Sequence, residues 1–523
     1  MGMKIDRRRL GVSAAALAVA SAMPSRGFAQ EKPRQGGHLR VGYPLFPTSL
    51  DAILGRSGGD AYYWRQIYDQ LVDADQALNP RASTSLASSW EVSKDPHAIT
   101  FNLREGVTFH DGTAFDAEAV KFNIERVLNP ETKATPRASM TAIKSVDVLD
   151  KHKVRFNLSQ PWGAGLGVLS DRGGVMNSPA AVAKLGADYG FKPAATGPFK
   201  VAEVVTGSHV RLVRNENYWG RDAQGNKLPY LDEITIKAIL DETVLVSALR
   251  AGEIDIAYLP MKDVQAFQSD RKYRLTKMDG GGIGYLVTFN QAKPPFNDVN
   301  LRLAVSSAID PTPINEAIYF GKFIQADSGM WPTGTWAHDA TIPRPKFDPA
   351  KAKEYLKKAG KPNGFSFEGI TWTNATHPQS AEIVKAQLSA VGIDMKITIQ
   401  SVQAATSNFF AGTTGDMFLT SWSRYPEPDW MASLAYKSDG YYNAGKVKRP
   451  DVDALVEQGA ALYEVAERKK VYRKIDEIVL GEAWYVPLLY AVTYAAANGK
   501  VQNLDTLICN DGKMNLRELW LKA

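Results

Sequence analysis

The stretch FNLREGVTFHDGTAFDAEAV, residues 101–120, places His110, Asp111, Asp116 and Glu118 within nine positions. Ionisable side chains this close together indicate either a catalytic or metal-binding site, or turns and helix ends that need polar groups. His110 and Asp111 end a run of alternating polarity at an Asp-Gly pair, which is typical of a turn after a strand. The role of the four groups therefore depends on the segment that follows the turn.

That segment has the pattern of a helix that begins after Asp116. A carboxylate at this position accepts hydrogen bonds from the free N–H groups of the first turn, and Glu118 lies where it opposes the positive end of the helix dipole. The full capping box is missing, because position 119 is Ala. Two of the four groups thus have structural roles, and the sequence predicts scaffold here.

The rest of the chain shows no catalytic or metal-binding motif. The seven histidines do not form the spacings of zinc sites, and Cys509 is the single cysteine. The glycine-rich run at 280–284 precedes a predicted strand, which is the wrong context for a dinucleotide loop. We therefore expect no catalytic residue, no bound metal and no cofactor, and we expect Cys509 to be a packed side chain without a disulfide partner.

The first 29 residues have the layout of a secretory signal peptide. A basic start is followed by an apolar run from about Leu10 to Met23 that is too short to span a bilayer, and small residues follow. The segment Asp6–Leu10 also resembles a twin-arginine signal loosely, so export by the Sec or the Tat route stays open. Beyond the leader, no apolar stretch approaches the length of a membrane span.

Charge and composition set further limits. The chain has 44% hydrophobic and 23% charged residues, which is ordinary for a soluble globular protein. Of its 62 Lys and Arg and 56 Asp and Glu, the leader holds five and one, so the remainder has a net charge of +2. This removes the main support for nucleic-acid binding. The protein is expected to be an exported monomer.

Periodicity predicts a mixed α/β chain with more than one lobe. Alternating polarity indicates strands at 36–44, 147–159 and 207–219, and a strand pair within 96–109 that turns at 105–106. In FDPAKAKEYLKKAG (347–360), a capping Asp and a Pro at the first helical position begin a helix that ends at Gly. A second helical pattern lies near 471–479.

The extended stretch FNLREGVTFHDGTAFDAEAVKFNIERVLNP (101–130) closely resembles the signature of the extracellular solute-binding proteins of ABC importers, family 5. The matches that follow in the family's order are TGPFKV (196–201), VRNENYWG (213–220), LPYLDEITIKAI (228–239), LRAGEIDIAYLP (249–260), TFNQAKPPFNDVNLRLAVSSAID (288–310), FDPAKAKEYLKKAG (347–360), QLSAVGIDMKI (387–397) and ERKKVYRKIDEIVLGEAWYVPLLY (467–490). The resemblance covers essentially the whole chain after the leader.

This resemblance implies a two-lobed periplasmic-binding-protein type II fold (cluster C) that closes on a small solute and delivers it to an ABC permease in the inner membrane. The implied order is a signal peptide (1–29), lobe I (30–277) with an inserted subdomain (about 75–190), lobe II (278–488) and a C-terminal return to lobe I (489–523). Chain crossings between the lobes are expected near 276–290 and 488–500. The stretch 101–120 would belong to the subdomain, away from the ligand.

The segment TSWSRYPEPDWM (420–431) resembles the family's pocket segment, Trp-Ser-Gly-Arg-Pro-Asp-Pro-Asp. Trp422 and Ser423 match, whereas Arg424 replaces Gly, and Tyr425 stands where dipeptide-binding relatives carry an acid for the α-ammonium group. This departure argues against a simple di- or tripeptide. Arg424 would instead grip a carboxylate, and the aromatic rings would face a sugar ring or an aliphatic chain.

The alternative is that Arg424 forms a structural ion pair with Glu427 or Asp429. The complete set of candidate ligand-binding residues, those outside this segment by analogy only, is Trp422, Ser423, Arg424, Tyr425, Asp429, Tyr63, Trp372, Asn290 and Tyr441. Peptides, opine-like amino acid–sugar conjugates, oligosaccharides, chelated metals and other anionic or polar metabolites remain open as ligands. The competing functions are a secreted hydrolase of peptides or glycosides, and a periplasmic chaperone or signalling partner.

Overall fold

The computed structural model describes residues 32–278, 284–374, 376–412, 414–422, 425 and 427–522. Residues 35–522 belong to one compact unit, which holds the strands and helices described below. The predicted signal peptide lies outside the described residues.

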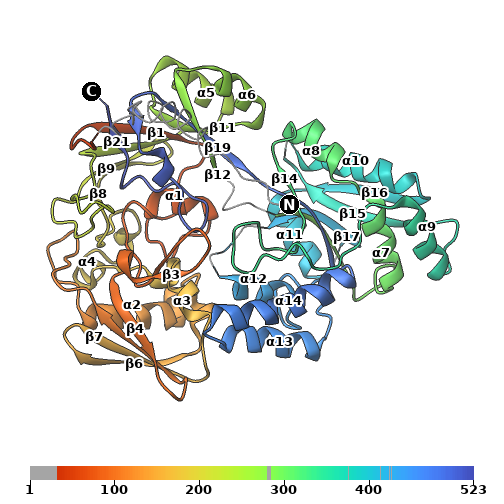
Figure 1. Ribbon diagram of the computed structural model, residues 1–523, viewed down its shortest axis with the longest axis horizontal. Helices are drawn as coiled ribbons and strands as arrows, with labels where there is room; N and C mark the ends of the chain where they lie inside the picture. Colours follow the sequence, from red (N-terminus) through yellow and green to blue (C-terminus); the bar gives the residue numbers. More distant parts are fainter. Residues whose placement is uncertain are drawn as a thin grey trace, which may run out of the picture. The chain divides into compact units, whose positions relative to one another are not determined.

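A seven-stranded sheet forms the centre of what we call lobe I. Its order is β12 (Tyr273–Met278), β19 (Thr493–Asn498), β11 (Ile256–Leu259), β1 (His38–Tyr43), β10 (Glu233–Ala238), β9 (His209–Arg214) and β8 (Phe199–Val205). The predicted alternation in β1 is confirmed, since Leu39, Val41 and Tyr43 are buried. Helices α5 (Glu242–Ala251) and α6 (Met261–Ser269) pack beside β11 and β12 (Figure 1).

A six-stranded sheet forms the centre of lobe II. Its order is β14 (Ile324–Gln325), β18 (Tyr485–Tyr490), β13 (Gly284–Phe289), β17 (Met417–Trp422), β15 (Phe365–Trp372) and β16 (Ile393–Gln400). The helices of this lobe are α7 (Val299–Ala308), α8 (Thr312–Tyr319), α9 (Pro349–Lys358), α10 (His377–Ser389), α11 (Val402–Phe410), α12 (Pro428–Ala435), α13 (Pro450–Ala461) and α14 (Val465–Gly481). Two apolar cores cover this sheet, one rich in α7, α9 and α10 and the other in α12 to α14.

A four-stranded antiparallel sheet carries the stretch that opened the sequence analysis. Its order is β4 (Ala87–Val92), β5 (Ala98–Leu103), β7 (Lys153–Leu158) and β6 (Ile143–Asp150), with α2 (Ala117–Leu128) packed against β6 and β7. Short elements that complete this half of the chain are α1 (Ala61–Trp64), β2 (Asp73–Ala74), β3 (Pro80–Arg81), α3 (Gly165–Val168), α4 (Pro179–Leu185), β20 (Val501–Gln502) and β21 (Trp520–Leu521).

The ionisable groups of 101–120 act as scaffold, as predicted. The His110 ring accepts a hydrogen bond from the Ala195 N–H at Nδ1 (3.2 Å) and donates from Nε2 to the Gly197 carbonyl (3.0 Å). Burial lowers the pKa of His110 to about 4, so the ring stays neutral while it makes these two hydrogen bonds. Asp111 accepts hydrogen bonds from Thr113 and Ser178.

Two strand predictions differ from the structure. Residues 147–159 form a hairpin, because the chain turns at 151–152 between β6 and β7 and pairs with itself. Residues 96–109 contain one strand, β5, which pairs with β4 and β7 on its two sides, whereas the part after 105–106 bends away. Local alternation therefore located strand-forming residues correctly but not their partners.

The Asp116 cap is the contact that begins α2, with its Oδ1 accepting from the Ala119 N–H at 3.0 Å. We expect Asp116→Ala to lower the free energy of unfolding by about 1 kcal/mol, because one helix-end N–H loses its partner. Urea denaturation measures this, with Glu118→Ala on the exposed face of the same first turn as the matched control. A loss no larger than that of the control would contradict the capping role.

Candidate ligand site between the strand ends

The chain passes between the two sheets on the side where several strands of each sheet end, and we call this side the edge of the sheet. In lobe I, Met278 at the end of β12 pairs with Thr493 at the start of β19, and β11 ends beside the same part of β19. Because β1 runs parallel to β11, its last residue, Tyr43, lies at this edge too. The carboxyl ends of parallel strands are the usual position for ligands in α/β folds.

The corresponding edge of lobe II carries aromatic side chains. Gly284 at the start of β13 pairs with Trp422 at the end of β17 and with Tyr490 at the end of β18. Strand β15 runs parallel to β17 and ends at Trp372. Large rings at the ends of three strands thus lie where the chain passes from one lobe to the other.

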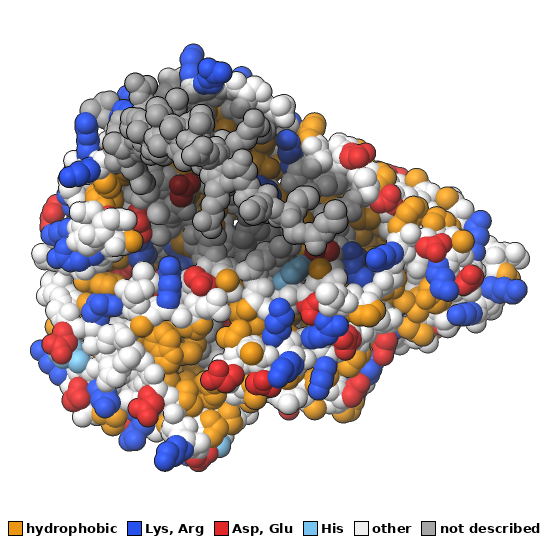
Figure 2. Space-filling view, in the orientation of Figure 1, with side chains coloured by type: hydrophobic (Ala, Val, Ile, Leu, Met, Phe, Trp, Pro, Cys, Tyr) orange, Lys and Arg blue, Asp and Glu red, His pale blue; other side chains and the backbone are white. Residues whose placement is uncertain are grey.

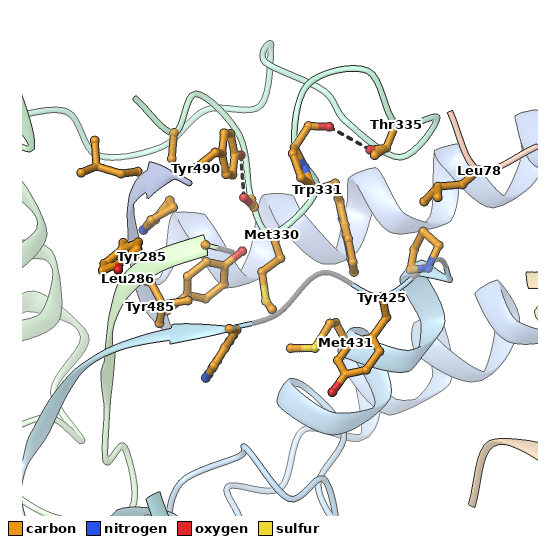
Figure 3. Close-up of a pocket in the computed structure, with 18 residues that line it drawn as sticks. Leu78, Tyr285, Leu286, Met330, Trp331, Thr335, Tyr425, Met431, Tyr485 and Tyr490 are labelled. Carbon is orange, nitrogen blue, oxygen red and sulfur yellow. Dashed lines mark hydrogen bonds between the residues drawn. The ribbon is translucent and has the colours of Figure 1, made fainter. Parts of the chain in front are cut away.

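A pocket lies against this edge (Figure 3). It is lined by β13, by the ends of β17 and β18, by α12 and by the loop at 326–335, and among its described lining residues Leu78 comes from lobe I. Trp331, Trp422, Tyr425 and Tyr485 give it mainly aromatic walls. The empty space inside the pocket is about 540 Å³, open solvent included.

The structure brings together two of the predicted residues of the pocket segment. Trp422 is buried and Tyr425 is half-buried, and both line the pocket. The Tyr425 ring stacks on Trp430, with ring centroids 4.4 Å apart. Ser423 and Arg424 lie outside the described residues.

The acids that follow have different environments. Both carboxylate oxygens of Glu427 bind the buried Arg468 guanidinium, at 2.5 and 3.1 Å, so this acid already has a structural partner. Asp429 lies in the first turn of α12 and accepts a hydrogen bond from the Ser433 hydroxyl at 3.3 Å. Burial, followed by the charge of Glu427, raises the pKa of Asp429 to about 7. Asp429 borders a second groove, together with Trp162 of lobe I, rather than the aromatic pocket.

The remaining candidates lie elsewhere. Tyr63 is fully buried and donates its hydroxyl hydrogen bond to the Leu45 carbonyl at 2.6 Å. Asn290 is buried at the far end of β13, where its amide oxygen accepts from the Ala292 N–H. Tyr441 is 49% exposed and borders the groove that Asp429 lines. None of these three lines the aromatic pocket as the structure describes it.

Trp372 belongs to a ring cluster at the lobe II edge that the sequence analysis missed. The His377 ring lies between Trp372 and Tyr285, at centroid distances of 4.7 and 5.0 Å. Burial lowers the pKa of His377 to about 4. Its position at the start of α10, next to a Pro at the second helical position, resembled an ordinary helix end in sequence.

Lobe I contributes a cluster of tyrosines at its own edge. Tyr43 lies 4.0 Å from Tyr62 and 5.4 Å from Tyr258, measured between ring centroids. The Lys513 ammonium group lies over the Tyr62 ring, 5.3 Å from its centroid, and within the described residues it has no carboxylate at ion-pair distance. Tyr62 stands beside the predicted Tyr63 in a stretch that the sequence also favoured, whereas Lys513 carries no sequence signal because the C-terminal tail reaches this edge through tertiary folding.

Comparison with known families decides the class of protein. The sequence profile of the bacterial extracellular solute-binding proteins, family 5 Middle, matches residues 82–443. The chain belongs to this family. Among its relatives, the glutathione-binding protein GsiB of Escherichia coli K12 is 28% identical over 438 residues, which cover 81% of this chain and 83% of GsiB.

Solved structures agree on the fold. The periplasmic binding protein DppA from Helicobacter pylori, in complex with the peptide STSA, is 26% identical, has a TM-score of 0.78 and covers 94% of this chain and 99% of its own. CtaP from Listeria monocytogenes, at 22% identity, has a TM-score of 0.83 over 93% of this chain and all of its own. The two-lobed type II fold predicted from the sequence is confirmed.

Membership of the family sets the general function. This binding protein is the solute-binding component of an ABC importer, and it is not an enzyme. Its partners are a small ligand and the ABC permease, without nucleic acid. Figure 2 shows basic and acidic side chains interspersed over the visible described face. In the part of the chain that the structure describes, no helix has the length and apolar character of a membrane span, and no group of three metal-ligating side chains occurs.

The buried His377 predicts a pH dependence of stability. Its folded pKa is below the ~6.5 of an unfolded histidine, so its contribution is complete above pH 6.5 and is lost as pH falls through about 4. We expect His377→Phe, which keeps a ring between Tyr285 and Trp372, to flatten the fall in melting temperature over this range. Differential scanning calorimetry at several pH values measures it.

His97→Phe, at an exposed position, is the matched control for this comparison. The account predicts that the control keeps the wild-type acid slope. If His377→Phe keeps it as well, His377 does not exclude the proton in the folded state.

Proposed function

We propose that this binding protein captures a small carboxylate-bearing solute, a peptide derivative or an opine-like conjugate, between the aromatic strand ends of its two lobes. The observation that carries the proposal is the position of the rings. Trp422 and Tyr490 in lobe II and Tyr43 in lobe I end strands at the edges where the chain crosses between lobes. Aromatic walls with a few charged groups are typical of sites for small polar ligands.

The charge of the ligand follows from the cations available at these edges. Lys513 has an aromatic platform in Tyr62 and no carboxylate partner among the described residues. Arg424 follows Ser423 in the pocket segment, and Tyr425 supplies no acid for an ammonium group. Glu427, which the sequence offered as an ion-pair partner for Arg424, has both oxygens bound by Arg468. A ligand carboxylate would therefore supply the opposite charge for Lys513, and we propose Arg424 as a second anchor.

The relatives point to the same chemistry. GsiB is a glutathione-binding protein, and the DppA structure holds a tetrapeptide. Glutathione is a peptide with two carboxylates and an unusual γ-linkage, so it suits a site that recognises carboxylates more than an α-ammonium group. Of the two ligands, we expect glutathione to fit this site better.

The finer cellular assignment belongs to the same proposal. Residues 1–29 would direct export by the Sec or Tat route and be removed, which leaves the mature protein in the periplasm to deliver solute to the inner-membrane permease. Residues 30–277 and 489–523 would form lobe I, with an inserted subdomain at about 75–190, and residues 278–488 would form lobe II. Closure of the two lobes by hinge motion would then enclose the solute.

Binding measurements test the proposed ligand class. Native mass spectrometry of the freshly purified protein should show a retained acidic solute whose mass is unchanged after incubation. In titration calorimetry we expect glutathione to bind more tightly than the peptide STSA. Arg424→Ala should weaken glutathione binding more than ten-fold, about 1.4 kcal/mol, because a bidentate ion pair is lost.

Lys351→Ala is the matched control, since Lys351 lies on the exposed face of α9 and pairs with Glu354. It should leave the affinity unchanged. A retained solute without an acidic group, or wild-type affinity in Arg424→Ala, would contradict the proposal.

A further inference from the structure

A buried acid lies behind the pocket, and neither the general function nor the proposed ligand class accounts for it. Asp476 on α14 is completely buried. Both of its carboxylate oxygens lack a hydrogen-bond partner among the described residues. A buried ionised carboxylate without a partner is so unfavourable that such a group takes up a proton instead. Burial, opposed by Trp331 and reinforced by the charge of Asp339, raises the pKa of Asp476 to about 8.

The loop that forms one wall of the pocket lies directly on this acid. A Cβ atom at Gly329 would come within 2.8 Å of both Asp476 oxygens, so the backbone of the loop approaches closely because residue 329 has no side chain. Two positions later, the Trp331 ring lies edge-on to Tyr472, one helical turn before Asp476, with a centroid distance of 5.9 Å. Residues 329 and 331 therefore cover the same face of α14.

Trp331 has an unpaired hydrogen-bond donor, and Asp476 has unpaired acceptors. The Trp331 Nε1 is buried and, like the Asp476 oxygens, has no partner in the described part of the chain. An indole N–H is a donor without acceptor capacity, and a neutral carboxyl group offers an acceptor oxygen and one O–H. A small shift joins the two, and ionisation of Asp476 strengthens this hydrogen bond, because the Trp331 N–H favours the carboxylate form of the acid.

Hydrogen bonds also hold the loop that contains Gly329 and Trp331 in place. The Tyr490 hydroxyl donates to the Gly329 carbonyl at 2.7 Å, and the His338 ring donates to the Trp331 carbonyl at 2.9 Å. Trp336 of the same loop donates its backbone N–H to the Ala77 carbonyl of lobe I at 3.2 Å. A change at Asp476 thus reaches both the pocket wall and a contact between the lobes.

The charged and titratable groups around Asp476 come from every neighbouring element. Tyr436 follows α12 and Tyr485 lies on β18, and their hydroxyl groups bind each other at 3.0 Å. Tyr490 on β18, Asp327 and Asp339 on the loop, and Arg473 and Glu477 on α14 complete the set, with Arg473 bound to Asp339 and Glu477. No described cation lies within ion-pair distance of Asp476.

We propose that Asp476 is a proton-dependent positioning residue of the ligand pocket, whose carboxylate form takes the Trp331 indole N–H and fixes the 328–331 segment in the pocket wall. Uptake of a proton weakens this hold and frees the segment. The importance of this for binding rests on the proposed function, but the coupling between Asp476 and Trp331 does not.

The test observes Trp331 without any ligand. In protein labelled with ¹⁵N-tryptophan, the Trp331 indole resonance is assigned by its loss in Trp331→Phe and followed from pH 6 to 9.5. We expect it to shift with a midpoint near 8 in the wild type and to stay constant in Asp476→Asn. Glu477→Gln, on the exposed side of the same helix, should keep the wild-type midpoint.

Asp429→Asn tests a neighbouring carboxyl group whose pKa is also raised and which accepts a hydrogen bond from the Tyr472 hydroxyl at 3.5 Å. If the transition disappears in Asp429→Asn and persists in Asp476→Asn, or if the resonance does not move in folded wild type, the proposal is wrong. If Asp476→Asn does not fold, acrylamide quenching of the wild type decides instead, after the signal of Trp331→Phe is subtracted. Trp331 should become less accessible above pH 8, and unchanged or increased accessibility overturns the proposal.

Calorimetry at pH 7 and 9 then connects the residue to function. Glutathione should bind more tightly at pH 9 than at pH 7 in the wild type, and this gain should be absent in Asp476→Asn. If neither glutathione nor STSA binds at either pH, the proposed ligand class fails, while the ligand-free resonance still decides the role of Asp476.

Discussion

Two antiparallel strand pairs determine where this protein brings its lobes together. β12 lies next to β19 in one sheet, and β13 lies next to β18 in the other. The chain leaves lobe I after β12 and returns to it at β19, so both connections are at the same edge of each sheet. The proposed closure would use these two connections as a hinge, which would change the separation of the lobes without disturbing either core.

The residues at these edges suit capture better than catalysis. Rings from β1, β13, β15, β17 and β18 provide broad apolar surfaces, while the charged groups nearby are few and mostly held in structural pairs such as Glu427 with Arg468. A binding protein needs such walls, a few polar anchors and two conformations. The ionisable cluster at 101–120 serves the scaffold, as the two hydrogen bonds of the His110 ring show.

Local signals in the sequence predicted local structure well. The Asp116 and Asp348 caps and the alternation in β1 depend on neighbours within a few residues, and all three are confirmed. The hairpin at 147–159 was missed because alternation does not reveal which strand is the partner. Trp422 and Tyr425 were found through the resemblance to the family, which supplies information that a single sequence lacks.

The missed residues depend on tertiary folding. Asp476 lies among charged residues in RKIDE, and its burial arises because a loop some 145 positions earlier folds over α14. Lys513 and Tyr62 meet although they are separated by most of the chain. Neither contact has a periodicity or a spacing that a sequence pattern could reveal.

Small-angle X-ray scattering of the mature protein tests the central claim most directly. Protein freed of retained solute by mild unfolding and refolding is measured alone and after that solute is added back. The account predicts a smaller radius of gyration in the presence of solute, because the strand-end edges close on it. Superimposable scattering curves at saturating solute would contradict capture by closure of the two lobes.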